Sequence, residues 1–189
     1  HHEDAAREAL GVIVAGHTPG DTAAFGMETA DPAVVRANNL KAMPDDVFRA
    51  IEIVNEVGGR RTAGIPELLP GINFVIGLAG ETPATFDANE AFLRRVLDAG
   101  LLVRRVNIRQ VMPFEGTRAY EENTLGMHDA RFRAFKEWTR REFDEPMLAR
   151  VFPPGTILRD VVIEVAGRPS FGRQMGSYPI LVGIPLTLP

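Results

Sequence analysis

The residues best suited to binding a ligand lie in the stretch over 70–82, Pro-Gly-Ile-Asn-Phe-Val-Ile-Gly-Leu-Ala-Gly-Glu-Thr. Its apolar run over 72–76, interrupted by one asparagine, predicts a buried strand that stops at Gly77. Gly77 and Gly80 allow the backbone to turn sharply or to approach a ligand closely, and Glu81 adds a carboxylate before the next helix. This pattern is typical of the rim of an α/β sheet. A strand-to-helix loop without a ligand explains the same residues, so both interpretations stay open at this point.

Two other polar groups accompany predicted strands. Glu28 and Thr29 end a short strand, and the polar residues of 107–110 belong to a strand predicted over 101–111. The carboxyl ends of parallel strands meet at one edge of a sheet, where α/β proteins bind their ligands. We therefore expect both groups to converge with residues 77–81 into one site.

The elements that must position these groups alternate along the chain up to about residue 150. Strands are predicted over 22–28, 72–76 and 101–111, and helices over 4–15, 33–36, 44–58, 83–99 and 129–150. Strands separated by helices imply parallel pairing through right-handed crossovers. The aromatic residues of the last helix, Phe132, Phe135, Trp138 and Phe143, are interpreted as a packing face.

Composition narrows the function classes. The 189 residues fall short of the roughly 250 of a complete α/β barrel, so we expect one large unit with a small appendage. No apolar run approaches the roughly 20 residues of a membrane span. The absence of cysteine and of a leader pattern favours a cytoplasmic location. The net charge of −4 gives no general attraction to nucleic acid or anionic lipid, so such binding must be local.

The chain changes character after the Pro-Pro-Gly run at 153–155. Residues 157–165 are β-branched and partly alternating, a turn follows at 167–169, and 171–188 is typical of short strands. This predicts two domains, 1–150 and 151–189, the second a small all-β, barrel-like unit.

Four motifs together resemble the second half of the radical S-adenosylmethionine (SAM) enzymes. They are Phe-Gly-Met-Glu-Thr-Ala-Asp at 25–31, Asn-Asn-Leu-Lys at 38–41, Gly-Leu-Ala-Gly-Glu-Thr at 77–82 and Pro-Phe-Glu-Gly-Thr at 113–117. The resemblance covers about residues 12–125. It implies a partial, here half, parallel α/β barrel that binds SAM. In that family a four-iron four-sulfur (4Fe-4S) cluster held by three cysteines cleaves SAM to a 5′-deoxyadenosyl radical.

The resemblance also implies roles for single residues. Glu28 and Thr29 would meet the ribose, because a carboxylate can accept hydrogen bonds from two vicinal hydroxyls. Ile76, Gly77 and Leu78 would lie against the adenine, where a glycine with flanking aliphatic side chains leaves flat, apolar room. The full set expected to bind SAM is Glu28, Thr29, Asn73, Ile76, Gly77, Leu78, Glu81, Asn107, Arg109 and Gln110.

One departure from the family pattern is severe, because the chain contains no cysteine at all. Thiolates are the usual ligands of such a cluster, and the four histidines lack metal-ligand spacing. We assign no metal site and no catalytic residue, and expect that this chain cannot run radical chemistry alone. Either it is a fragment of a longer enzyme that holds the cluster elsewhere, or its lineage has lost the cluster.

The tail resembles the small TRAM β-barrel of methylthiotransferases, which holds RNA or, in some members, a protein substrate. The similarity lies in 155–164, in Phe-Gly-Arg-Gln at 171–174 and in Tyr-Pro-Ile-Leu-Val at 178–182. Arg159 and Arg173 are the candidate RNA contacts, although a cap on the barrel explains the tail equally well. The core motifs at 38–41 and 104–110 are also similar to an archaeal-type group of iron–sulfur oxidoreductases.

Two functional hypotheses follow from these resemblances. In the first, the chain is the part of a radical SAM enzyme that carries the ribose and adenine side of the SAM site and the strands facing an unknown substrate. In the second, it is a non-catalytic module that binds RNA or protein. Under either, a half barrel exposes a strand edge and apolar faces, so an oligomer formed through that edge is expected.

Overall fold

The computed structural model describes residues 2–174 and 179–185. Its centre is a three-stranded parallel sheet in the order β1 (Asp21–Glu28), β4 (Leu68–Ile76) and β5 (Arg105–Gln110). Helices α2 (Pro32–Ala37) and α3 (Pro44–Gly58) lie between β1 and β4 in the chain, and α4 (Pro83–Asp98) between β4 and β5. Helix α1 (His2–Gly16) precedes them. The predicted mixed α/β fold with parallel pairing is confirmed.

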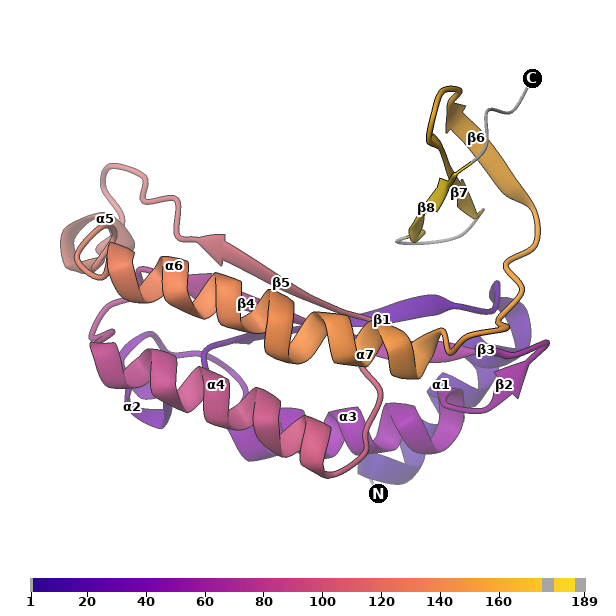
Figure 1. The fold of residues 1–189 in the computed structure, drawn as a ribbon. Coiled ribbons are helices and arrows are strands. Elements are labelled where there is room, and N and C mark those ends of the chain that lie inside the picture. Colours follow the sequence, from indigo (N-terminus) through magenta and orange to yellow (C-terminus); the bar gives the residue numbers. More distant parts are fainter. Residues whose placement is uncertain (1, 175–178, 186–189) are drawn as a thin grey trace.

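The helices cover one face of the parallel sheet and leave the other open. Figure 1 shows α3 and α4 on one side, while the excursion that carries α5 (Arg118–Glu122) and the small C-terminal sheet rise at opposite ends of the other side. On β4 the alternate residues Ile72, Phe74 and Ile76 are buried in the core, whereas Asn73 and Val75 are only partly covered. The open face is therefore the one on which a ligand can lie.

The last long helix packs through its aromatic residues, as predicted. It comprises α6 (Asp129–Trp138), a π-helical turn η1 (Thr139–Asp144) and α7 (Glu145–Val151). Phe135 is fully buried, with ring centroids 5.5 Å from Phe74 and 6.2 Å from Phe86 in edge-to-face geometry. The π turn was not predicted. Its cause is Pro146, which has no N–H to donate and would crowd the preceding turn of a regular α-helix.

Strand β5 is shorter than the predicted 101–111. Residues 101–104 form a loop because the Asn55 side chain satisfies the backbone of Leu102, accepting from its N–H at 2.8 Å and donating to its carbonyl at 2.9 Å. A backbone held in this way has no need of a strand partner. β5 therefore begins at Arg105, opposite Gly71.

Strand β4 is longer than predicted, since it begins at Leu68 and continues through Pro70. A proline disrupts a ladder only where its missing N–H is needed. The Pro70 carbonyl accepts from Arg104 N at 2.7 Å, just before β5 starts, so that side of Pro70 faces no strand. The connection ahead of β4 contains an unpredicted antiparallel pair, β2 (Arg61–Thr62) and β3 (Ile65–Pro66).

The tail contains an antiparallel sheet of β6 (Val161–Val165), β7 (Ser170–Gln174) and β8 (Leu181–Ile184). The small all-β unit is therefore seen in part, and the predicted turn at 167–169 joins β6 to β7. The strand predicted from residue 157 begins at Val161 instead. Tyr178 of the TRAM-like motif and residues 186–188 lie outside the described residues. The division at residue 150 and the TRAM resemblance stay predictions.

No helix in the described part of the chain is both long enough and apolar enough to cross a bilayer.

Candidate functional site

The open face of the parallel sheet holds a cavity of about 410 Å³, a size typical of small-molecule sites. The strand register arranges the residues of this face in rows. One row is Ala24, Gly71 and Arg105, and the next is Gly26, Asn73 and Asn107. The residues that line the cavity are Ala24, Glu28, Gly71, Asn73, Phe74, Val75, Arg105, Asn107 and Arg109.

Glu28 lines this cavity because it lies on the same face of β1 as Ala24 and Gly26, the alternate residues before it. The pairing with β4 shifts between Gly26 and Glu28, and Glu28 itself has a left-handed backbone with φ of 65°. Met27, on the opposite face with Phe25, is 1% exposed, and the Glu28 side chain lines the open face. The register shift places Glu28 opposite Phe74, where an unbroken ladder would place Met27.

Partial burial changes the pKa of Glu28. It raises the pKa of the Glu28 carboxyl above its ordinary value, because the charged form loses part of its water. A carboxylate in this environment gains more than an exposed one from hydrogen bonds that a ligand donates. Glu28 is therefore suited to accept from paired hydroxyl groups.

Two asparagine side chains join the three strands across the middle row. Asn73 Nδ2 donates to the Phe25 carbonyl at 3.2 Å, and Asn107 Nδ2 donates to Asn73 Oδ1 at 3.2 Å. Asn107, one of the polar residues of β5, is thereby paired across the sheet. This chain of amides gives the cavity a polar floor held in fixed geometry.

The β5 wall of the cavity is basic. Arg105 and Arg109 both line it, while Arg104, between strand and loop, lines a separate cavity on β5. Gly71 makes room for Thr22, because a Cβ at Gly71 would lie 2.8 Å from Thr22 Cγ2, while Arg105 Cγ at 3.4 Å would be an ordinary contact. Arg105 and Gly71 were not among the predicted site residues, although a glycine within a strand signals a close approach of this kind.

The loop after β4, which begins at Gly77, forms a second candidate site beside the open-face cavity. Gly77 has φ of +96° and its N–H donates to Glu81 Oε2 at 3.0 Å, so Glu81 is used inside the loop. Asn38, from the motif at 38–41, holds the loop from outside. Its Nδ2 donates to the Ala79 carbonyl at 2.9 Å, and its Oδ1 accepts from Ala79 N at 3.2 Å. Sequence reasoning had singled out this motif without assigning Asn38 a role.

A segment that follows α5 covers this loop. Thr124 N donates to the Gly77 carbonyl at 3.0 Å, and Thr124 Oγ1 donates to the Leu78 carbonyl at 3.1 Å. A Cβ at Gly77 would lie 3.3 Å from Leu125 Cα. The space left between the two segments is a cavity of only about 10 Å³. A purine would need the Thr124–Leu125 segment to move away.

The predicted residues thus lie in two places rather than one. Glu28, Asn73, Asn107 and Arg109 share the open-face cavity, whereas Ile76, Gly77, Glu81 and Gln110 line the small cavity beneath the covering segment, and Leu78 is bonded to that segment. Thr29 is 2% exposed, and its Oγ1 donates to Asn89 Oδ1 and accepts from Asp31 N. It helps to anchor the chain beyond Glu28.

A further, partly buried acid, Asp144, lies between β5 and the last helix. Asp144 and Arg104 line a largely apolar cavity of about 210 Å³. Burial raises the pKa of Asp144 to about 6. Burial, with a smaller contribution from the charge of Arg105, lowers the pKa of Arg104, whose guanidinium lies 5.2 Å from the Phe152 ring. Because the charged form of Asp144 is costly to bury, the free energy of unfolding should depend on pH.

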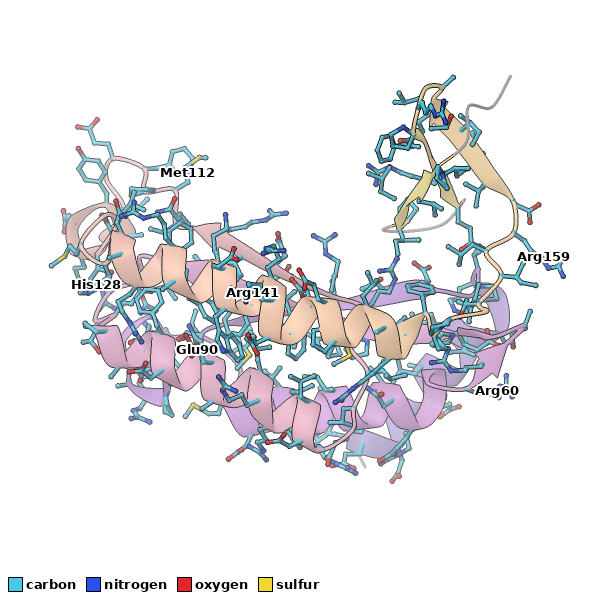
Figure 2. The ribbon with its side chains drawn as sticks, viewed as in Figure 1. Arg60, Glu90, Met112, His128, Arg141 and Arg159 are labelled. Carbon is cyan, nitrogen blue, oxygen red and sulfur yellow. The ribbon has the colours of Figure 1, made fainter. Side chains whose placement is uncertain are left out.

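The two arginines suggested for RNA lie on the tail. Arg159 is exposed on the connection to β6 and points away from the parallel sheet in Figure 2. Arg173 Nε donates to Glu164 Oε2 at 3.0 Å. In the residues that the structure describes, no group of three or more metal-ligating side chains comes together.

Comparisons with known proteins find two similar sequences and a similar fold. No protein-family model matches the chain. It is 50% identical over 188 residues to a protein of Methanocaldococcus jannaschii and 46% identical over 186 residues to one of Archaeoglobus fulgidus, both described as uncharacterized. Each match covers 97% of this chain and 35% of the relative, so the chain spans about a third of their length.

Among solved structures, the chain is similar to coproporphyrinogen III oxidase (HemN) from Escherichia coli, described as a radical SAM enzyme. The TM-score is 0.52 with 16% identity, and the match covers 96% of this chain and 49% of that one. The likeness supports a radical SAM-like fold for this chain.

Proposed function

We propose that this chain is the part of a radical SAM enzyme that binds the ribose side of SAM and faces the substrate. The observation that carries the proposal is the placement of Glu28. Its partly buried carboxylate, on the face of β1 that Ala24 and Gly26 share, lines a cavity of about 410 Å³ together with Asn107 and Arg109. Such a carboxylate can accept from both hydroxyls of a ribose.

The fold supports the same proposal. A radical SAM-like sheet places ligands at the carboxyl ends of its strands, which is where Glu28 and Arg109 lie. The longer archaeal relatives leave room for further barrel strands. This chain supplies no thiolate, so in the proposal any cluster ligands belong to another part of a longer protein.

The residues present fit the SAM ribose better than its adenine. Glu28 would hold the ribose, while the amide chain of Asn73 and Asn107 would keep the floor beneath it rigid. For adenine to meet Ile76, Gly77 and Leu78, the segment at Thr124 must shift. When bound to a reduced cluster, SAM supplies a 5′-deoxyadenosyl radical, and the side chains named here would orient it and exclude water.

The test uses adenosine, because the methionine part of SAM is normally held by the cluster. Titration calorimetry compares adenosine with 2′-deoxyadenosine on the unaltered chain and on Glu28→Gln. A hydrogen bond to a charged group contributes about 1.5–3 kcal/mol, so 2′-deoxyadenosine should bind roughly 10- to 100-fold more weakly. Glu28→Gln should remove most of that difference.

Glu90→Gln is the matched control. Glu90 also has its pKa raised by burial, but it lies on α4, as Figure 2 shows, and does not line the cavity. It should leave both affinities unchanged. Equal binding of the two nucleosides to the unaltered chain would show that Glu28 does not read a ribose. Absence of adenosine binding would remove the SAM-site proposal itself.

The alternative of an RNA-binding module gains no support from the arginines expected to carry it. Arg173 is engaged with Glu164, and Arg159 points away from the sheet. Residues 151–189 contain three arginines, one aspartate and one glutamate. This small excess of positive charge attracts a polyanion only weakly.

A further inference from the structure

The segment that follows β5 is held to the rest of the chain by few bonds. We call residues 112–127 the strap, which carries α5 and covers the loop after β4. Among the described residues, the hydrogen bonds of 112–123 stay inside the strap. Thr124 bonds to the loop instead, with its N–H donating to the Gly77 carbonyl at 3.0 Å and its Oγ1 to the Leu78 carbonyl at 3.1 Å. Thr124 therefore holds the strap against the loop.

The strap buries little apolar surface. Its large apolar side chains are 40% to 73% exposed, and they are Met112, Phe114, Tyr120, Leu125 and Met127. Figure 2 shows Met112 above the end of β5, on the open side of the sheet. Because lifting the strap would remove few apolar contacts from the core, the two bonds of Thr124 are the main resistance to opening.

Both ends of the strap adjoin residues that are fixed to the sheet. Val111 N, just before the strap, donates to the Ile76 carbonyl at 2.7 Å. His128, just after it, has Nε2 3.1 Å from the Glu81 carbonyl oxygen. Gly126 has φ of +81° with nothing within 4 Å of its Cβ position, so the backbone can turn there without a collision. The strap can thus pivot while β5 and α6 keep their positions.

We infer that the strap is an autoinhibitory contact, in which Thr124 occupies the place that the nucleoside base needs. The inference rests on the proposed function, which sets adenine against Ile76, Gly77 and Leu78. With the strap closed, the carbonyls of Gly77 and Leu78 accept from Thr124, and a cavity of only about 10 Å³ is left between the two segments. With the strap open, these carbonyls can accept from the amino group of adenine. The base therefore competes with Thr124, and the open fraction of the chain limits the affinity.

The experiment compares adenosine binding by the unaltered chain and by Thr124→Val in titration calorimetry. Valine keeps the shape of the side chain but removes the Oγ1–H donor, which weakens the closed form and not the open one. Adenosine affinity should rise roughly two- to tenfold, the factor expected for one neutral hydrogen bond. A residue that only supports the site would lower the affinity when removed, so an unchanged or lower affinity would overturn the inference.

Hydrogen exchange of the Thr124 amide in the unaltered chain gives a second measurement. Saturating adenosine should speed this exchange by about tenfold or more, because the bond to the Gly77 carbonyl is broken when the base enters. The Val111 amide, bonded to the Ile76 carbonyl, should not exchange faster. Slower exchange at Thr124 would mean that the strap stays closed over the ligand, which contradicts competition. This measurement also provides the test if Thr124→Val fails to fold by circular dichroism.

Thr156→Val is the matched control, because Thr156 Oγ1 also donates to a backbone carbonyl, that of Pro153 at 2.7 Å, and lies outside the strap. It should change the adenosine affinity less than about twofold. Thr124→Ser keeps both donors of Thr124 and should likewise stay within about twofold of the unaltered chain. An equal rise in affinity in Thr156→Val would show that the effect does not come from the strap.

Adenosine binding separates this inference from the proposed function. If adenosine binds in preference to 2′-deoxyadenosine but Thr124→Val does not strengthen it, the strap inference is wrong and the proposed function stands. If adenosine binds to neither the unaltered chain nor Thr124→Val, the proposed function falls, and the strap inference falls with it.

Discussion

Gly26 provides the space that the Glu28 carboxylate occupies, since a Cβ at Gly26 would lie 2.6 Å from Glu28 Oε1. Real Cβ atoms essentially never approach another atom so closely, so one of the two must move. The two residues flank the register shift in β1, and the missing side chain at Gly26 allows the carboxylate its position.

Gly26→Ala should therefore displace the Glu28 carboxylate without removing it. We expect adenosine affinity to fall and the preference for adenosine over 2′-deoxyadenosine to shrink, as with Glu28→Gln. Stability should change by no more than about 1 kcal/mol, because the colliding atom is the end of a flexible side chain. Calorimetry and thermal melts measure both quantities.

Gly11→Ala is the control for that change, as it adds the same methyl group to α1 with nothing within 4 Å. It should leave nucleoside binding unchanged and stabilise the helix by up to about 1 kcal/mol. An unchanged nucleoside preference in Gly26→Ala would contradict the coupling.

The pH dependence of nucleoside binding follows from the raised pKa of Glu28. Only the deprotonated carboxylate accepts from both hydroxyls, so adenosine affinity should decrease as the pH falls through a pKa above the ordinary 4.5. In Glu28→Gln this decrease should be absent. Calorimetry between pH 4.5 and pH 8 measures it, and a pH-independent preference for adenosine in the unaltered chain would argue against Glu28.

Asp144 should make the chain less stable at neutral pH than an amide would. Its pKa is raised by burial to about 6, so the folded state favours the protonated form. The contribution to stability is greatest below the unfolded pKa of about 4 and is lost as the pH rises to about 6. Asp144→Asn should therefore raise the free energy of unfolding at pH 7 by up to about 2 kcal/mol, after allowance for the water that reaches the group.

Urea unfolding at pH 4 and pH 7 measures the Asp144 effect, which should vanish at the lower pH. Glu142→Gln, an exposed acid in the same π turn, serves as control and should change stability by less than about 0.5 kcal/mol at either pH. A destabilised Asp144→Asn at pH 7 would mean that the carboxylate is paired, not isolated.

Asn38 should be important for the loop after β4. Asn38→Ala removes bonds to both backbone groups of Ala79 and to the Val34 carbonyl, at 2.8 to 3.2 Å. We expect a loss of about 1–3 kcal/mol and faster hydrogen exchange at Ala79, because its partly buried backbone loses these partners. Asn123→Ala, which loses three bonds at the exposed end of α5, to the Ala119 and Tyr120 carbonyls and to Leu125 N, should cost less than about 0.5 kcal/mol.

Local patterns in the sequence were sufficient to predict the parallel strands, the helices between them and the meeting of Glu28, Asn107 and Arg109, whereas residues 77–81, expected at the same site, lie beside it. The strands and helices follow from the spacing of apolar residues, which acts over a few positions. The meeting of the site residues follows from the parallel arrangement of the strands. The shared binding role of these residues stays a prediction.

Contacts between distant residues decided what the sequence did not reveal. Asn55 shortens β5 from 47 residues away, and Thr124 covers the Gly77 loop from a similar distance. The left-handed conformation of Glu28 was hidden for a different reason, since non-glycine residues seldom adopt it. The Gly-x-Glu spacing at 26–28 is the one local trace of that bulge.

The amide chain on the open face limits which substitutions positions 73 and 107 can accept during evolution. The Phe25 carbonyl can only accept, so Asn73 must turn its NH₂ group toward it, and Asn107 must then donate to Asn73 Oδ1. An aspartate at position 107 would set two oxygens against each other, and a leucine would leave Asn73 Oδ1 without its donor. Substitutions at the two positions should therefore occur together, and the pair is expected to co-vary among the longer archaeal relatives.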